Sequence, residues 1–129
     1  MDKNLSSEFF WVGAGGMTGA LLRHGTNNAF ESLFGETSFV TATTIENLLG
    51  SFLIGLIFTL LNRNNVQNEK LNLFLLTGII GSYTTYSGFM AEAFLLLQQS
   101  PSLFSAYIFS QIIAGIIAVW LGIMFCKKS

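Results

Sequence analysis

Two pairs of hydrogen-bond donors stand out because each lies inside a long apolar stretch of the sequence. Thr43 and Asn47 are four residues apart, as are Tyr107 and Gln111, so each pair shares one face if its segment is helical. Polar side chains within membrane-length apolar segments are costly and are functional candidates by default. Donors without a fixed positive charge can replace the water around a small anion and still release it, as conduction requires. Each donor could instead bond its own helix or a neighbouring one.

A third group of candidates lies in a glycine-rich, β-favouring stretch within another apolar segment. Residues 78–88 carry three glycines around the run Ser-Tyr-Thr-Thr-Tyr-Ser, which predicts a broken helix. Lipid cannot satisfy an opened backbone, so such a break must be buried in protein or line a water-filled path. Ser87 adds a hydroxyl, and Tyr86 and Phe89 add aromatic rings whose edges are positive. Together with the donor pairs, these residues favour a permeation path, although each alone fits an ordinary core.

The composition places the chain among membrane proteins rather than soluble enzymes or nucleic-acid-binding proteins. Hydrophobic residues make up 51% of the 129 residues and charged residues only 10%, whereas a soluble domain carries about 25% charged residues. The net charge is −1, and the sequence holds no basic cluster that could follow a phosphate backbone. The single cysteine and the single histidine, Cys126 and His24, supply neither a disulfide nor a metal-binding set. We therefore expect no enzymatic activity.

Four apolar stretches are separated by polar connectors. A helix that spans a bilayer needs about 20 mostly apolar residues. We predict an all-α integral membrane protein, a single four-helix domain over residues 1–129, in which the third helix is broken at mid-membrane. The predicted spans are about 8–24, 38–61, 71–98 and 103–126.

The first span is short and rich in glycine. Gly15 and Gly19 stand in the Gly-x-x-x-Gly spacing that lets two helix backbones approach closely. Arg23 lies at the end of the span, where its long side chain can reach the interface, and a polar connector follows over 24–36. Four helices of this size are too few to enclose a pore, so we expect an oligomer, most simply a dimer.

The distribution of lysine and arginine predicts the orientation of the chain in the membrane. With four spans, both termini and the loop at 62–70 lie on one side, which holds five of the six basic residues. We therefore predict a multi-pass protein of the cell (plasma or inner) membrane with both termini in the cytoplasm. The five residues are Lys3, Arg63, Lys70, Lys127 and Lys128, against Arg23 alone on the other side.

Four stretches, in this order, resemble the Fluc (CrcB) fluoride channel family. They are Gly-Gly-Met-Thr-Gly-Ala-Leu-Leu-Arg at 15–23, Asn-Leu-Leu-Gly-Ser-Phe at 47–52, Gly-Ser-Tyr-Thr-Thr-Tyr-Ser-Gly-Phe-Met-Ala-Glu at 81–92, and Ala-Val-Trp-Leu-Gly at 118–122. The third stretch is the most specific, and the resemblance covers nearly the whole chain. It implies a fluoride-selective ion channel that exports fluoride passively from the cytoplasm and so gives fluoride resistance.

The resemblance also implies an assembly and a set of site residues. The assembly is an antiparallel dimer of four-helix subunits with two narrow fluoride pores around a structural Na⁺ at the dimer centre. Backbone carbonyls of Gly81 and Thr84 would hold this ion, and oxygen ligands suit a hard cation. Gln111 stands where the family has a serine. The positions that match pore residues are Thr43, Asn47, Tyr86, Ser87, Phe89, Glu92 and Tyr107.

Three residues depart from the family pattern. Tyr86 adds a hydroxyl to a pore phenylalanine, and Gln111 is bulkier than the serine it replaces. Glu46 stands beside Asn47 at a position that is usually apolar. A carboxylate at mid-membrane costs about 2.5–3.5 kcal/mol on insertion scales, so it must face water, pair or be protonated. Beside an anion path it would repel fluoride, and its role stays open at this point.

Alternatives follow from these departures and from the charge bias. A single chain that forms an antiparallel dimer must insert in both orientations, which a five-to-one bias opposes. The chain is therefore one half of a homodimer or one of two paired homologous subunits, and in the pair it could be a non-conducting partner. A further alternative, a small four-helix proton-coupled multidrug exporter, needs a carboxylate within the membrane, for which Glu46 and Glu92 are candidates.

Overall fold

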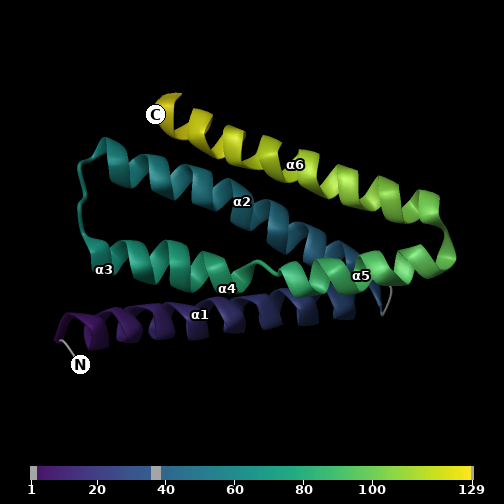
Figure 1. The fold of residues 1–129 in the computed structure, drawn as a ribbon, viewed down its shortest axis with the longest axis horizontal. Coiled ribbons are helices and arrows are strands. Elements are labelled where there is room, and N and C mark those ends of the chain that lie inside the picture. The colour runs from purple at the N-terminus through teal and green to yellow at the C-terminus, as the bar shows by residue number, and fades with distance from the viewer. Residues whose placement is uncertain (1–2, 36–38, 129) are drawn as a thin grey trace.

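The chain folds into a bundle of helices, of which the third is interrupted (Figure 1). The computed structural model describes residues 3–35 and 39–128, and no strand occurs within these two ranges. The predicted all-α class with four helices is confirmed. In chain order the elements are α1 (Lys3–Phe34), α2 (Phe39–Arg63), the third helix made of α3 (Glu69–Asn72), η2 (Leu73–Ile80), α4 (Gly81–Tyr83) and α5 (Tyr86–Gln99), and finally α6 (Pro101–Lys128).

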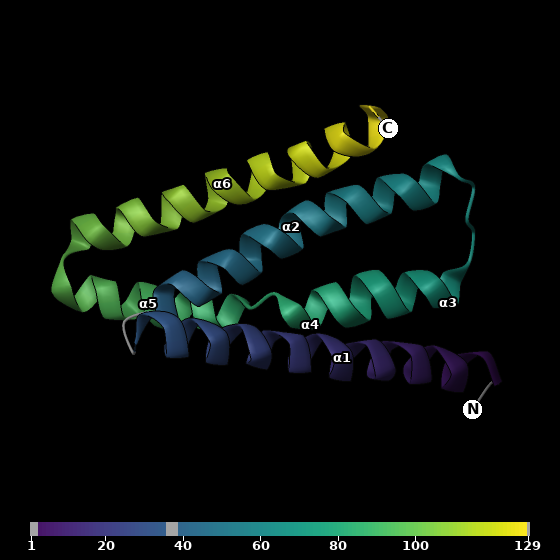
Figure 2. The same ribbon diagram turned by 180° about the vertical axis from the view of Figure 1, so that it is seen from behind.

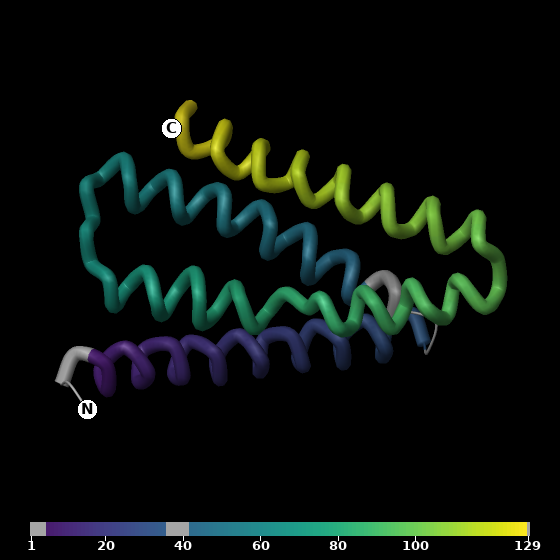
Figure 3. The backbone as a smooth tube through the Cα atoms, viewed as in Figure 1, coloured from purple at the N-terminus to yellow at the C-terminus, as the bar shows by residue number. Residues whose placement is uncertain are grey.

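The helices run lengthwise beside one another, and both ends of the chain lie at the same end of the bundle (Figures 1 and 2). α1 packs along η2 and α4, whereas α2 makes its most extensive contact with α6. The connection from α2 to α3 lies at the end that holds the termini, and the turn between α5 and α6 lies at the other (Figure 3). Short connections of this kind make successive helices antiparallel.

Glycines bring α1 against the third helix. A Cβ at Gly15 would overlap the carbonyl oxygen of Phe74 and lie 2.9 Å from the Cα of Gly78. A Cβ at Gly19 would overlap the carbonyl oxygen of Ile79. Only residues without a Cβ permit this approach of one backbone to another. The Gly-x-x-x-Gly spacing therefore lies where α1 meets η2.

A second glycine contact joins α2 and α6. A Cβ at Gly55 would overlap the carbonyl oxygen of Val119. A Cβ at Gly122 would meet the backbone of α2 in the same way. Near the chain terminus, Nη1 of Arg63 donates to the carbonyl oxygen of Cys126 at 2.9 Å. This bond satisfies one of the carbonyls that the last turn of a helix leaves without an intrahelical partner.

Most large apolar side chains lie on the outside of the bundle. Only five apolar side chains among those described are buried, whereas leucines, isoleucines and phenylalanines of the long helices are exposed. Soluble monomers rarely expose apolar surface of this extent, so lipid or a second subunit must cover it. Two helices, Ala42–Arg63 and Pro101–Lys128, are long and apolar enough to cross a bilayer. The others fall short because α1 is rich in glycine and polar residues and the third helix is interrupted.

The structure corrects the polar connector predicted over 24–36, because α1 continues through most of this stretch. Arg23 consequently lies within a long helix rather than at its end. Side chains one turn apart support the extension, as Nδ2 of Asn28 lies 3.1 Å from Nε2 of His24. The helix ends at Phe34, and the next residue, Gly35, adopts a left-handed φ of 81°, which suits the position after a helix C-terminus.

The third helix contains an eight-residue π-helical stretch, η2, which the sequence did not predict. π-Helical turns are rare, and they occur mostly as single turns inside α-helices. η2 presents Gly78 to α1 and leads through α4 into the interruption. The predicted start of the second span, residue 38, lies outside the described residues.

Candidate functional site

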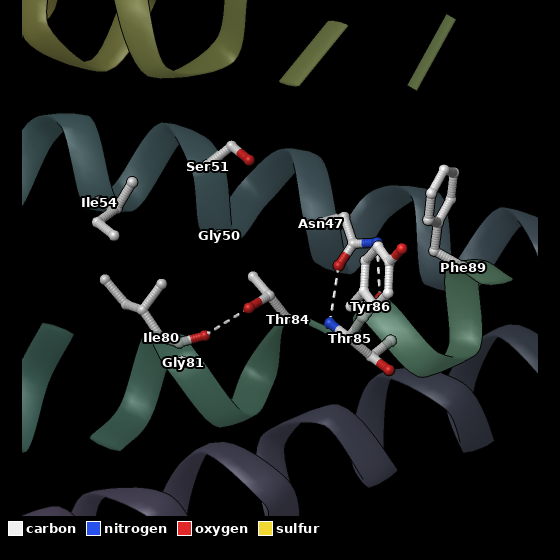
Figure 4. A pocket seen from close by; sticks show the side chains of 10 residues that line it. All are labelled: Asn47, Gly50, Ser51, Ile54, Ile80, Gly81, Thr84, Thr85, Tyr86 and Phe89. Atoms are coloured by element: carbon white, nitrogen blue, oxygen red, sulfur yellow. Dashed lines mark hydrogen bonds between the residues drawn. The ribbon is translucent and has the colours of Figure 1, made fainter. Parts of the chain in front are cut away.

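The third helix opens at Thr84 and Thr85, which separate α4 from α5. Both residues are extended, with ψ of 154° at Thr84 and 116° at Thr85. The side chain of Asn47, from α2, binds the opened backbone (Figure 4). Its Nδ2 donates to the carbonyl oxygen of Thr85 at 3.1 Å, and its Oδ1 accepts from the N–H of Thr85 at 2.8 Å. Thr85 in turn caps α5, because its Oγ1 accepts from the N–H of Gly88 at 3.0 Å.

These bonds release two carbonyl groups from the helix. In a continuous helix the N–H of Thr85 would bond to the carbonyl of Gly81, and the N–H of Gly88 to that of Thr84. Asn47 and the hydroxyl of Thr85 take these two N–H groups instead. The break leaves the carbonyls of residues 81–84 without their helical donors. Two of these four, those of Gly81 and Thr84, are the carbonyls for which the sequence resemblance implies a bound cation.

A cavity of about 330 Å³ lies along the opened backbone, and we call it the break cavity. Figure 4 shows the side chains that line it, which come from α2 and from both sides of the break. Its wall is polar near Asn47 and Thr85 and apolar near Ile54 and Ile80 (Figure 4). The cavity therefore places an amide, hydroxyl groups and backbone carbonyls next to a hydrophobic wall.

A second cavity, of about 130 Å³, lies between α2, α5 and α6. Asn47 and Phe89 line both this cavity and the break cavity, so they stand between the two. Gln111, from α6, lines the second cavity and donates from Nε2 to Oγ1 of Thr44 at 2.7 Å. The amides of Asn47 and Gln111 are therefore brought to one cavity, although each already has an acceptor within the chain.

Three aromatic rings follow one another across α5 and α6. The ring centroids of Tyr86 and Phe89 are 6.1 Å apart, and those of Phe89 and Tyr107 are 5.4 Å apart. Tyr86 is 75% exposed, whereas Phe89 and Tyr107 are half-buried. The first ring therefore stands on the outer surface of the single subunit, where another protein surface would be needed to enclose it.

A buried carboxyl group lies at the other end of this row of rings. Glu92 is fully buried, and one of its oxygens accepts a hydrogen bond from the hydroxyl of Tyr107. Thr43, also buried, interacts with the same carboxyl group. Ser87 is exposed, and its Oγ lies 3.2 Å from Oγ1 of Thr85.

The predicted hydrogen-bond donors lie in different surroundings in the structure. Thr43 and Asn47 share α2, but Thr43 faces Glu92 while Asn47 binds the break. Thr85, which joins Asn47 to the start of α5, was not among the predicted site residues. The sequence did carry a signal for it, since a threonine three residues before Gly88 fits a helix N-cap. No group of three or more His, Cys, Asp or Glu that could hold a metal occurs in the described part of the chain.

Replacing Tyr107 with phenylalanine is expected to destabilise the fold by about 1–3 kcal/mol, because it removes a donor from a buried carboxyl group. The measurement is the thermal unfolding midpoint of the purified protein in detergent. Tyr86→Phe is the matched control, since that side chain is largely exposed, and it should leave the midpoint nearly unchanged. Equal midpoints for the two variants would show that the bond to Glu92 adds nothing to stability.

Comparison with known proteins agrees with the resemblance seen in the sequence. A family model described as CrcB-like protein, Camphor Resistance (CrcB), matches residues 10–123. A Flavobacterium psychrophilum protein named fluoride-specific ion channel FluC is 36% identical over 120 residues, or 92% of this chain and 96% of the relative. A protein of the same name from Ruminiclostridium cellulolyticum is 41% identical over 115 residues, or 89% of this chain and 80% of the relative. Another, from Oceanobacillus iheyensis, is 36% identical over 118 residues, or 88% and 89%.

Proposed function

Since this chain belongs to the CrcB-like protein family, we propose that it is a fluoride-selective ion channel that exports fluoride passively from the cytoplasm. The chain is a membrane protein and not an enzyme. The observation that carries the proposal is the third helix, opened at Thr84 and Thr85 and bound by the amide of Asn47. A backbone opened in this way is tolerated in a membrane only where it is buried in protein or lines a water-filled path.

The donors near the break suit a small anion that must bind weakly. The amides of Asn47 and Gln111 and the hydroxyl of Tyr107 each donate to an oxygen of the same chain. Fluoride passing these groups would replace that oxygen as the acceptor, and none of the three donors carries a positive charge that would trap it. The rings of Tyr86 and Phe89 would add positive edges beside the same path.

The proposal includes a second subunit in antiparallel orientation. Four helices do not enclose a path, and Tyr86 is 75% exposed at the edge of the break cavity. The long helices also carry exposed apolar side chains that a partner subunit or lipid would cover. A second copy, or a homologous subunit, would complete two pores at the contact between the subunits.

A Na⁺ ion at the centre of this dimer is part of the proposal. The carbonyls of Gly81 and Thr84 have lost their helical donors to Asn47 and Thr85, so their oxygens are available to a cation. Carbonyl oxygens are suitable ligands for a hard cation, and equivalent carbonyls of a second subunit would complete the ligand set. The ion would hold the two breaks together and would not take part in conduction.

Both termini are proposed to lie in the cytoplasm. They share one end of the bundle with the connection from α2 to α3 (Figure 1), and this end carries Arg63, Lys70, Lys127 and Lys128. The positive-inside rule favours that end for the cytoplasmic side. The same bias opposes insertion in both orientations, which leaves a homodimer and a pair of oppositely oriented homologous subunits as the two assemblies to separate.

A second candidate function is that of a non-conducting partner subunit. It is favoured by Glu46, a fully buried carboxyl group one residue from Asn47, and by the bond that already engages Gln111. The multidrug exporter considered from the sequence is not favoured, because the relatives reported above are named fluoride-specific ion channels and the family match covers residues 10–123.

Liposomes that hold the purified chain alone are expected to release fluoride and to retain chloride. The measurement is efflux into an outer solution with a fluoride-selective electrode, repeated with chloride and its electrode. Selective fluoride efflux would support a channel that assembles from one kind of chain. Absence of efflux from folded protein would contradict self-assembly, and co-reconstitution with a homologous subunit of opposite charge bias would then separate a paired channel from a degenerate pore.

A further inference from the structure

A third cavity, of about 260 Å³, is lined by Arg23 and Glu46, two charged residues that the proposed fluoride path does not include. We call it the Glu46 cavity. α1, α2, the break and α5 each contribute to its wall. The residues of the wall that bear on the argument are Arg23, Asn27, Thr43, Glu46, Thr85 and Ser87.

Glu46 has no hydrogen-bond partner in the protein. Its side chain is fully buried, and both Oε1 and Oε2 lack a donor. Oδ1 of Asn27, on the same cavity, is also buried without a donor. Buried polar atoms of this kind are ordinarily satisfied by ordered water or by an ion. The cavity is large enough for several water molecules, since one occupies about 30 Å³ in the liquid.

Arg23 is the positively charged side chain on this cavity. It does not bond to Glu46 directly, since neither carboxyl oxygen has a hydrogen-bond partner. Arg23 comes from α1 and Glu46 from α2, and both line this cavity, so two opposite charges share one space. The extension of α1 past the predicted span adds Asn27 to the wall of the same cavity. Water between the two groups would give a pair that is close to neutral.

The Glu46 cavity adjoins the proposed fluoride path. Thr85 lines both this cavity and the break cavity, and it is the residue that Asn47 binds. Ser87 lines the Glu46 cavity and has its hydroxyl 3.2 Å from that of Thr85. Charges in a cavity that lies so close to the path act on an anion with little screening by salt.

We propose that Glu46 and Arg23 form a water-bridged charge pair that sets the affinity of the adjoining path for fluoride. Arg23 attracts the anion towards Ser87 and Thr85, and Glu46 opposes it, so the pair keeps fluoride from binding too tightly to leave. The proposal rests on the proposed channel function. It explains why a carboxylate at this position is compatible with an anion path, because Arg23 compensates its charge.

A double-mutant cycle tests the pair. The variants are Glu46→Gln, Arg23→Gln and the double variant, and the measured quantity is the fluoride concentration that gives half-maximal efflux from liposomes. Glu46→Gln should lower this concentration about tenfold, and Arg23→Gln should raise it by a similar factor. The double variant should return to within about twofold of the wild type. Glu31→Gln, on an exposed part of α1, is the matched control and should change nothing.

A double variant whose half-maximal concentration stays as low as that of Glu46→Gln would overturn the proposal, because Arg23 would then exert no attraction for Glu46 to offset. If Arg23→Gln alone fails to fold, the double variant should still fold, since the carboxylate that Arg23 compensates is absent. Its half-maximal concentration should then lie about tenfold above that of Glu46→Gln. A half-maximal concentration that changes in the double variant as much as in Arg23→Gln would also overturn it.

A second readout does not depend on conduction. The thermal unfolding midpoints of the same four proteins in detergent should be non-additive, with the double variant more stable than Arg23→Gln alone. If the wild type conducts no fluoride, the proposed channel function is wrong. The thermal unfolding midpoints then test the charge pair on their own. A rise in the midpoint with added Na⁺ that Glu46→Gln abolishes would overturn the pair in favour of a cation site.

Discussion

Replacing Asn47 with aspartate is expected to reduce fluoride efflux from reconstituted liposomes by at least roughly 100-fold, which corresponds to about 2.7 kcal/mol in the barrier. The change removes the Nδ2 donor and leaves an oxygen opposite the carbonyl oxygen of Thr85, where a 3.1 Å hydrogen bond existed. Two acceptors cannot bond to each other, and the new negative charge repels the permeating anion. The bond from the N–H of Thr85 to Oδ1 remains possible, so the break keeps one of its two attachments to α2.

Two controls make the result at Asn47 interpretable. Asn62→Asp introduces the same change at an exposed residue near the end of α2, and it should leave efflux at the wild-type rate. Gel filtration and the thermal unfolding midpoint of Asn47→Asp show whether the variant remains folded. Wild-type efflux in a folded Asn47→Asp variant would remove Asn47 from the conduction path.

The helices and the break could be predicted because they depend on local sequence. Four apolar stretches are visible without a structure, and the polar, glycine-rich run at 78–88 cannot continue an ordinary spanning helix. The exact position of the opening was not predicted. It falls at Thr84 and Thr85 because Asn47 and the cap on Gly88 take the N–H groups there.

The contacts of the site could not be predicted because they depend on how the helices are rotated against one another. Spacing along α2 places Thr43 and Asn47 on one face, yet the former meets Glu92 and the latter meets Thr85. The glycine contacts of α1 with η2 and of α2 with α6 fix these rotations, and they join residues far apart in the sequence. The same holds for Asn27, whose place beside the Glu46 cavity follows from the extension of α1.

Replacing Gly15 with alanine is expected to destabilise the fold by about 1–3 kcal/mol, and leucine at this position is expected to prevent folding. The added Cβ would overlap the carbonyl oxygen of Phe74 and lie 2.9 Å from the Cα of Gly78. Both neighbours are backbone atoms of η2, so no side chain can rotate away and α1 must move outward. The higher helix propensity of alanine works in the opposite direction by up to about 1 kcal/mol and does not offset the overlap.

Gly13 provides the matched control for this prediction, because it lies one half-turn away on α1 and a Cβ there has no atom within 4 Å. Gly13→Ala should leave the thermal unfolding midpoint in detergent unchanged or raise it slightly, whereas Gly15→Ala should lower it. Efflux should be lost in Gly15→Ala at temperatures where the wild type still conducts, since a displaced η2 also moves the break that Asn47 binds. Equal midpoints for the two variants would mean that close packing of α1 on η2 is not what holds the third helix in place, and the rotation argued from these glycines would then be wrong.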